Sequence, residues 1–298
     1  MWYRGEILSD RWTQHNMDKC GVAWWKMDES SGNLVDSKGS NTGTNVGTTV
    51  ITSPWYRGRN FNGSSYIRCD SQVIPLGAKS IRFKVKTTNN ITSEQDVVLL
   101  FNSDGYGIGS DGIRITQNSD NKIYISQTVD SSPIFSLASK KTINDGQWHD
   151  VLFTWDGTLN PNGVKLYIDN MMIPDNTSSA VSTSVKNASF PLYIGARGSG
   201  QHDRNFIGQL DEIEIYNDVI DPIPKYYFIQ TNDNKIWTYN TTWQDTGMVI
   251  GDLDYTNVSA KSNFETYGMF ADENLSSQAL QDLKGMGYTS YRVLMGKM

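Results

Sequence analysis

Short runs with the character of β-strands, separated by polar turn clusters, fill most of this chain from Val22 onward. Residues 80–86 show the pattern most clearly, because apolar and basic residues alternate strictly. Such alternation predicts an antiparallel strand with one buried and one solvated face. It places three apolar residues inward (Ile81, Phe83, Val85) and three basic residues outward (Arg82, Lys84, Lys86).

Other segments extend this pattern to a whole domain. Residues 97–101 form a continuous apolar run typical of a central strand, and residues 112–116 and 122–126 flank a polar turn, as in a β-hairpin. Charged residues make up only 19% of the chain, a composition that suits strands and turns better than helices. The sequence therefore predicts a mainly β protein built as a two-sheet antiparallel sandwich.

The length of 298 residues favours two domains. Because proline cannot donate to a strand ladder, residues 221–224, which contain two prolines, mark a boundary. We expect an N-terminal arm over residues 1–20, a sandwich over 21–222 and a small α+β module over 225–298. The arm packs either on another subunit or on the main domain, or it is an irregular segment that lies on its own domain. The module is predicted to hold a hairpin (226–230 with 235–239), a helix (275–284) and a final strand (291–295).

Charge and hydropathy exclude several classes of function. A net charge of −6 argues against sequence-independent nucleic-acid binding, which needs clustered Lys and Arg. No apolar run approaches the ~20 residues that span a bilayer, so no membrane insertion is expected. Residues 1–6 lack signal-peptide features, so Sec-type export is not supported. Cys20 and Cys69 are too few for a disulfide framework. Two buried free thiols are favoured over the alternative of a bridge between them.

One acidic strand has a counterpart near the start of the sandwich. Residues 208–216 combine apolar residues with a central acidic pair, and residues 23–32 repeat an aromatic and acidic pattern. This arrangement predicts a closed sandwich whose first and last strands meet. We expect Glu212 and Glu214 to be ordinary strand residues.

Ordered motifs then give a family resemblance. Residues 20–220 resemble LamG-like (concanavalin A-like) jelly rolls, which implies two antiparallel sheets in a jelly-roll sandwich. The motifs are WKMDESSG (25–32), DSKG (36–39), FNGSSYI (61–67), GQWHDV (146–151), TWDG (154–157), LYID (166–169), YIG (193–195) and FIGQLDEI (206–213). Residues 227–243 resemble short modules of bacteriophage tail and appendage proteins.

The same resemblance raises the question of glycoside hydrolysis. Hydrolases of this superfamily carry Glu, one residue, Asp, two residues and Glu on one strand, because the reaction needs two carboxylates across a cleft. Here Glu214 stands in the Asp place and Asn217 in the last Glu place, so a required carboxylate is missing. This departure disfavours an enzyme. His149 beside Asp150 is expected to be structural, because the Trp-His pair belongs to a framework strand in this family.

The resemblance also implies one structural calcium ion near the meeting point of the first and last strands. Asp28, Asp36 and Asp211 match the acidic positions of the motifs, and calcium prefers oxygen ligands of this kind. The alternative is that Asp28 and Asp36 cap turns while Asp211 pairs with a nearby base.

A carbohydrate site is the second binding expectation. Sugar sites combine an aromatic face with surrounding polar groups, and loops carry function disproportionately. Trp148 and Trp155 are better explained by core packing. The candidates are the aromatic residues Trp55, Tyr56 and Tyr106 and, in the loop 197–204, the polar residues Arg197, Gln201, His202 and Arg204.

These expectations combine into one hypothesis, a non-enzymatic adhesion module of a phage virion that recognises a surface glycan. Its partners would be that glycan and other virion subunits, within a homo-oligomer or larger assembly, and the missing export signal agrees with assembly in a host cytoplasm. The alternative is a structural virion component whose arm and tail mediate assembly without binding sugar.

Overall fold

The structure of this protein is a computed structural model. It describes residues 3–70, 72–92, 96–103, 112–129, 132–169, 173–176, 180–181, 190–198, 203–220, 222, 227–229, 235–240, 242–249 and 292–294. The chain divides into two compact units. The first is Asn16–Asp221, and the second combines Met1–His15 with Pro222–Met298.

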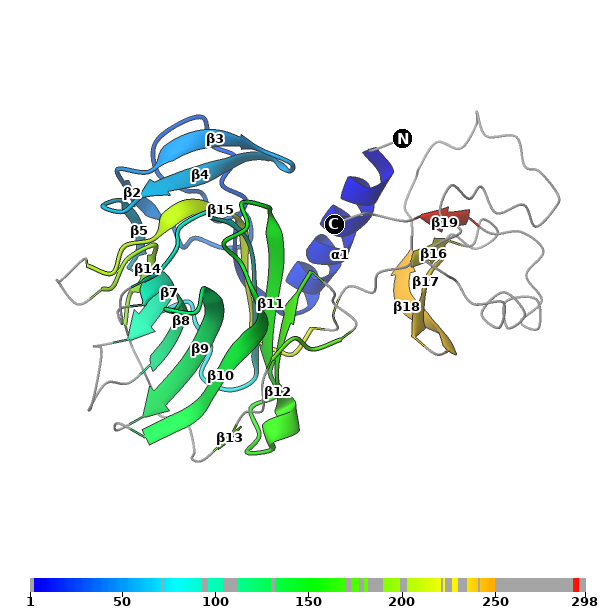
Figure 1. The fold of residues 1–298 in the computed structure, drawn as a ribbon. Helices are drawn as coiled ribbons and strands as arrows, with labels where there is room; N and C mark the ends of the chain where they lie inside the picture. The colour runs from blue at the N-terminus through cyan, green and yellow to red at the C-terminus, as the bar shows by residue number, and fades with distance from the viewer. Residues whose placement is uncertain are drawn as a thin grey trace. The chain divides into compact units, whose positions relative to one another are not determined.

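The larger unit is the predicted antiparallel β-sandwich of two sheets (Figure 1). In the seven-stranded sheet the order is β12 (Val164–Ile168), β11 (His149–Trp155), β6 (Lys79–Lys86), β15 (Ile207–Tyr216), β4 (Tyr56–Asn62) and β3 (Thr49–Ser53), and β1 (Gly21–Trp25) also pairs with β15. In the eight-stranded sheet it is β13 (Ala180–Val181), β10 (Ser132–Thr142), β9 (Lys122–Val129), β8 (Gly112–Gln117), β7 (Val97–Ser103), β14 (Leu192–Ile194), β5 (Tyr66–Cys69) and β2 (Thr44–Val46).

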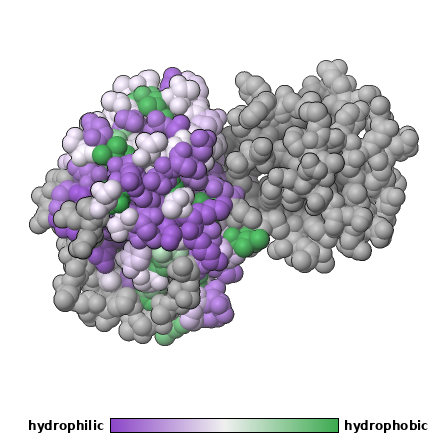
Figure 2. Space-filling model, viewed as in Figure 1, coloured by the Kyte–Doolittle hydropathy of each residue, from purple (hydrophilic) through white to green (hydrophobic). Residues whose placement is uncertain are grey.

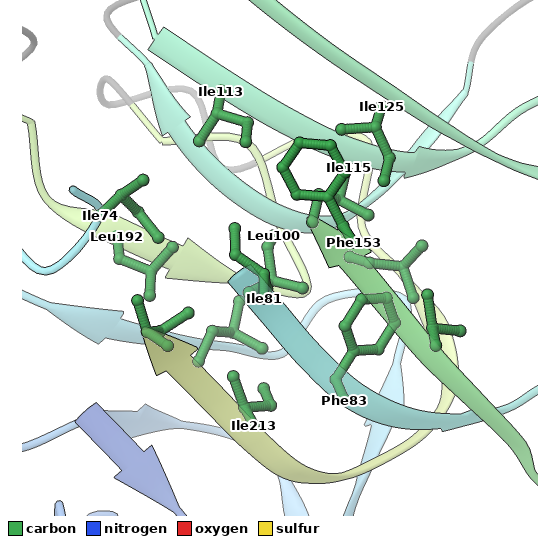
Figure 3. Packing of buried hydrophobic residues seen from close by; sticks show 14 of the residues in the cluster. Ile74, Ile81, Phe83, Leu100, Ile113, Ile115, Ile125, Phe153, Leu192 and Ile213 are labelled. Atoms are coloured by element: carbon green, nitrogen blue, oxygen red, sulfur yellow. The ribbon is translucent and has the colours of Figure 1, made fainter. Parts of the chain in front are cut away.

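The hydrophobic core lies between these two sheets. Ile81 and Phe83 of β6 point toward Phe153 of β11 and toward Leu100 and Ile115 of the facing sheet (Figure 3). All five side chains are at most 2% exposed, so the apolar half of the alternating pattern is confirmed. Outside the core, the view of Figure 2 shows a mostly hydrophilic face with small, separate hydrophobic patches. Cys20 and Cys69 are buried free thiols, as expected.

Strand β15 is where the first and last strands of the sandwich meet. Its first half pairs with β4, and its second half pairs with β1, so the predicted closure is confirmed. The ladder with β6 is irregular between Asp211 and Glu214, and Glu212 has a φ of 48°. This bulge lets Leu210 and Ile213 both face the core although they are three residues apart.

Two of the three basic residues of β6 that were expected to be solvated are buried, which corrects the sequence expectation, whereas Lys86 is partly exposed. Arg82 and Lys84 point away from the core, yet their side chains are only 1% and 2% exposed. Arg82 donates to Asp150 of β11 through Nε (3.0 Å) and Nη2 (2.7 Å) and to Glu214 of β15 through Nη1 (3.3 Å). Lys84 Nζ lies 2.5 Å from the same Asp150 carboxylate. Two cations and two anions thus balance across three neighbouring strands, which we call the buried charge layer.

The charges of this layer shift the pKa of Asp150. Burial alone would raise the pKa of Asp150, but Arg82 and Lys84 outweigh it and lower that pKa to about 2. Glu214 also accepts a 2.5 Å hydrogen bond from the hydroxyl of Tyr216, so it is not the ordinary strand residue expected from the sequence.

A different lysine of β6 bridges the two sheets. Lys79 is fully buried, and its Nζ donates to Gln127 Oε1 of β9 (2.9 Å) and to the Leu76 carbonyl (3.2 Å). The amine also lies 5.0 Å from the centroid of the Trp155 ring. Burial lowers the pKa of Lys79 to about 7.

The N-terminal segment and the C-terminal module complete the described chain. Residues Tyr3–Cys20 form helix α1, so the alternative of an irregular segment is wrong. The module contains β18 (Thr242–Val249), β17 (Lys235–Asn240), β16 (Tyr227–Ile229) and β19 (Arg292–Leu294), in that sheet order. The predicted hairpin and final strand are therefore confirmed, whereas the predicted helix at 275–284 lies outside the described residues. In the described chain, no helix has both the length and the apolar character to cross a bilayer. The division into independent domains stays a prediction.

Replacing Arg82 by Met should cost about 3–5 kcal/mol of unfolding free energy, because it leaves Asp150 and Glu214 buried without their main counter-charge. Urea unfolding measures this loss. The matched control is Lys122→Met, since Lys122 and Asp120 form an ion pair with side chains 31% and 49% exposed and should contribute less than about 1 kcal/mol. Equal losses for both variants would contradict the role of the buried charge layer.

Lys79→Met should change the pH dependence of stability. The pKa of Lys79 falls from 10.5 to about 7 on folding, so its contribution is present above pH 10.5 and lost as the pH falls through about 7. The melting temperature of Lys79→Met relative to the parent should therefore rise as the pH is lowered from 10 to 7. A difference that does not vary with pH would refute this.

Candidate functional site

The turn between β3 and β4 presents aromatic side chains to solvent. Ser53 and Tyr56 are the closing pair of a two-residue hairpin whose centre is Pro54 and Trp55. Such hairpins favour positive φ at their central residues, but proline is restricted to negative φ. Here the positive φ falls on Tyr56, at 114°, and Tyr56 is 60% exposed. A bulky residue in this conformation is strained.

A second tryptophan joins this turn from the segment before β11. The rings of Trp55 and Trp148 meet edge to face, with centroids 5.5 Å apart. Lys84 of the buried charge layer places its Nζ 4.9 Å from the centroid of the Trp55 ring. Both tryptophans are partly exposed, so the expectation of core packing fails for Trp148, whereas Trp155 is fully buried in the core. We call Trp55, Tyr56 and Trp148 the aromatic platform.

Hydrogen bonds of the buried residues Ser53 and Asp211 hold this turn on its inner side. Ser53 Oγ accepts a hydrogen bond from the Trp55 amide (3.1 Å) and lies 3.1 Å from the Arg57 carbonyl and 2.5 Å from Asp211 Oδ2. The Glu212 amide donates to Asp211 Oδ1 (2.9 Å). Ser53 Oγ donates to Asp211 Oδ2 when that carboxylate is ionised. When Asp211 is protonated, it donates to Ser53 Oγ instead and leaves the serine proton for the Arg57 carbonyl.

The electrostatic setting of Asp211 makes both protonation states accessible near neutral pH. Asp211 is fully buried, and burial raises its pKa to about 7, with Asp28 adding to the rise. Hydrogen bonds from Ser53 and Glu212 and the charge of Lys84 oppose the shift without cancelling it. Asp211 is therefore close to its titration midpoint at neutral pH.

Arg57 and Asp28 hold the other side of the turn. The Arg57 amide donates to Asp28 Oδ1 (3.3 Å), and Arg57 Nη1 donates to the Asp28 carbonyl (2.9 Å). The Arg57 guanidinium lies 4.2 Å from the centroid of the Tyr56 ring. Tyr56 thus sits between two anchored neighbours, with charged groups at its side.

The three predicted calcium ligands do not form one site. Among the residues that the structure describes, no three His, Cys, Asp or Glu side chains are placed to hold a metal ion. Asp36 accepts hydrogen bonds from the Trp24 and Lys38 amides at Oδ1 and from the Asn41 amide and side chain at Oδ2. Burial opposes its charge, but these donors lower its pKa. Asp36 thus caps a turn, as the alternative reading expected, and the structural calcium ion stays a prediction.

The predicted ligand residues separate into two groups. Trp55 and Tyr56 lie on the seven-stranded sheet, whereas the Val98 amide of β7 in the other sheet donates to the Arg204 carbonyl. Arg197 pairs with Asp203 at 2.5 Å, and Arg204 pairs with Asp96, so both arginines have carboxylate partners. Tyr106, Gln201 and His202 lie outside the described residues.

His149 has a structural setting, as expected. Its ring lies between Asp145 Oδ1 (2.9 Å from Nε2) and Asp169 Oδ2 (3.0 Å from Nδ1), and it is 6% exposed. Burial opposes protonation, but the two carboxylates raise the pKa of His149. Glu212, the other carboxylate at the bulge, accepts a 2.7 Å hydrogen bond from the Trp24 indole, which corrects the expectation of an ordinary strand residue.

Asp211→Asn should stabilise the protein at alkaline pH. The pKa of Asp211 rises from 3.8 to about 7 on folding, so its contribution is complete below pH 3.8 and lost as the pH rises through about 7. The variant cannot ionise, so its melting temperature should exceed that of the parent by roughly 3 °C or more at pH 8 and by little at pH 4.5. The control is Asp120→Asn at the exposed surface. A pH-independent difference for Asp211→Asn would contradict the assignment.

Comparison with known proteins identifies the family to which this architecture belongs. Residues 61–222, more than half of the 298, match the family model of the concanavalin A-like lectin/glucanases superfamily. No curated protein sequence matches the chain.

Solved structures show the same fold. Domain 4 of AbnA, a GH43 extracellular arabinanase from Geobacillus stearothermophilus in complex with arabinotriose, superimposes with a TM-score of 0.50 and 19% identity, over 66% of this chain and 92% of that one. The binding domain of Paraclostridial Mosquitocidal Protein 1 gives 0.54 and 14%, over 85% and 73%. The botulinum neurotoxin serotype D/C VPI 5993 binding domain gives 0.50 and 11%, over 81% and 65%. At these identities the likeness concerns the fold, and the family match is the stronger finding: the chain belongs to the concanavalin A-like lectin/glucanases superfamily.

Proposed function

We propose that this protein is a non-enzymatic carbohydrate-binding module whose ligand surface is the aromatic platform. The observation that carries the proposal is Tyr56, an aromatic residue 60% exposed at a turn whose two flanking residues are both anchored. Exposed aromatic residues are commonly scattered singly over a surface, whereas this one directly follows Trp55, whose ring meets that of Trp148.

The chemistry of the platform suits a saccharide. Aromatic rings offer an apolar face to the C–H groups of a sugar, and nearby polar groups fix its orientation. Arg57, whose guanidinium lies over the Tyr56 ring, supplies donors, and the neighbouring Asp28 supplies an acceptor. The buried charge layer behind Trp55 gives the platform a rigid support, because its charges are hydrogen-bonded across three strands. The binding-domain and arabinotriose-bound relatives support this reading through their fold.

The absence of enzymatic activity is part of the proposal. Glycoside hydrolysis needs two carboxylates that are free to act on opposite sides of the bond. Glu214 is occupied by Arg82 and Tyr216, and Glu212 is occupied by the Trp24 indole. Asn217 holds the position of the third acidic residue in the hydrolase pattern.

We place this module in a phage virion, as a tail or appendage protein that attaches to a host-surface glycan. The support is the resemblance of residues 227–243 to phage tail modules. In this setting the partners are the glycan and other virion subunits, the chain forms a homo-oligomer or part of a larger assembly, and assembly occurs in the host cytoplasm. A structural virion protein that binds no sugar is the competing function.

A glycan array identifies the ligand, and point variants then locate its site. Tyr56→Ala and Trp148→Ala should each weaken binding by about tenfold or more, because exposed aromatic residues dominate small interfaces. The matched controls are Arg197→Ala and Arg204→Ala, which change the loop between β14 and β15 and should leave affinity unchanged.

Two results would overturn this proposal. Loss of binding in the arginine controls but not in the aromatic variants would move the site to the other sheet. No binding to any glycan by a folded oligomer would favour the structural virion role.

A further inference from the structure

The conformation of Tyr56 needs an explanation beyond its exposure. Its backbone φ of 114° is one that residues other than glycine rarely adopt. The residue is also largely exposed, so buried contacts do not offset this conformational strain. Strained residues persist only where their surroundings hold them, and they gather at functional sites.

The holding groups are identifiable on both sides of Tyr56. On the N-terminal side, the Trp55 amide donates to Ser53 Oγ. On the C-terminal side, the Arg57 carbonyl lies 3.1 Å from the same hydroxyl. One hydroxyl therefore bonds to both neighbours of the strained residue, and Asp211 fixes that hydroxyl from below at 2.5 Å.

Asp211 is itself buried and hydrogen-bonded through both carboxylate oxygens. It lies in the bulge of β15, where the Glu212 amide donates to its other oxygen. The groups that face it are Asp28, the positive charge of Lys84, Ser53 and the Glu212 amide. The buried side chain of Asp211 therefore connects β15, in the middle of the sheet, to the exposed turn.

We propose that Ser53 and Asp211 are positioning residues that hold Tyr56 in its strained, exposed conformation so that its ring contacts the ligand. This inference rests on the proposed carbohydrate-binding function. Neither Ser53 nor Asp211 touches the ligand; both act through the backbone of Trp55 and Arg57. The sequence trades local stability at residue 56 for a fixed aromatic contact.

The strain is tested by Tyr56→Gly, because glycine adopts positive φ without penalty. The melting temperature should stay level or rise, while affinity for the glycan found on the array should fall by about tenfold or more. The matched control is Thr52→Gly, an exposed residue of neighbouring β3 with an ordinary φ, which should lower the melting temperature. Equal melting losses in both variants, or retained binding in Tyr56→Gly, would overturn the inference.

The anchor is tested without any ligand. Hydrogen exchange of the Trp55 amide, followed by NMR, should accelerate in Ser53→Ala and Asp211→Ala, because the acceptor is lost or released. Asp211→Asn should keep it slow, since an amide side chain donates to Ser53 Oγ and accepts from Glu212 as the protonated acid does. Unchanged exchange in Ser53→Ala would overturn the anchor.

These measurements separate the two proposals. If no glycan binds the parent protein, the carbohydrate function fails, and with it the role of Tyr56 in contacting a ligand. The exchange and melting results then still decide whether Ser53 and Asp211 hold a strained turn. If glycan binds but Ser53→Ala leaves both exchange and affinity unchanged, the positioning role alone is wrong.

Discussion

The bidentate bond between Arg82 and Asp150 is the interaction on which the seven-stranded sheet depends. It joins β6 to β11, and the third donor of Arg82 extends the connection to Glu214 on β15. Burying a charge costs free energy unless the charge is paired and hydrogen-bonded. If one partner is removed, the remaining buried charges keep their desolvation cost without the attraction that offset it. The three strands that position the bulge are thereby held in one register.

Two links connect this buried charge layer to the exposed β3–β4 turn. Lys84, which also contacts Asp150, lies under the ring of Trp55, and the bulge of β15 carries Asp211 toward Ser53. The exposed turn is thus attached to the sheet through side chains that are themselves almost completely buried. A loop tip of this kind would ordinarily be mobile, whereas these bonds give it a defined shape.

The sequence predicted the sandwich well because the period-two pattern of β6 and the motif order are local signals. Ile81, Phe83 and the meeting of β1 with β15 are where they were expected. The burial of Arg82 and Lys84 was not predictable, since Asp150 and Glu214 lie 68 and 132 residues from Arg82 in the chain and no local pattern reveals them. Trp55 and Tyr56 were named as candidates, but Trp148 was assigned to the core and Asp211 to a metal, because only the folded sheet places both at the β3–β4 turn.

The central claim is that a saccharide contacts the aromatic platform on the seven-stranded sheet. An NMR titration of the indole Nε1–H signals with the bound oligosaccharide measures this directly, because the protein carries tryptophans both at the platform and in the core. The signals of Trp55 and Trp148 should shift while those of Trp25 and Trp155 stay in place. Saturated binding that leaves the Trp55 and Trp148 signals unmoved would contradict a saccharide site on the aromatic platform.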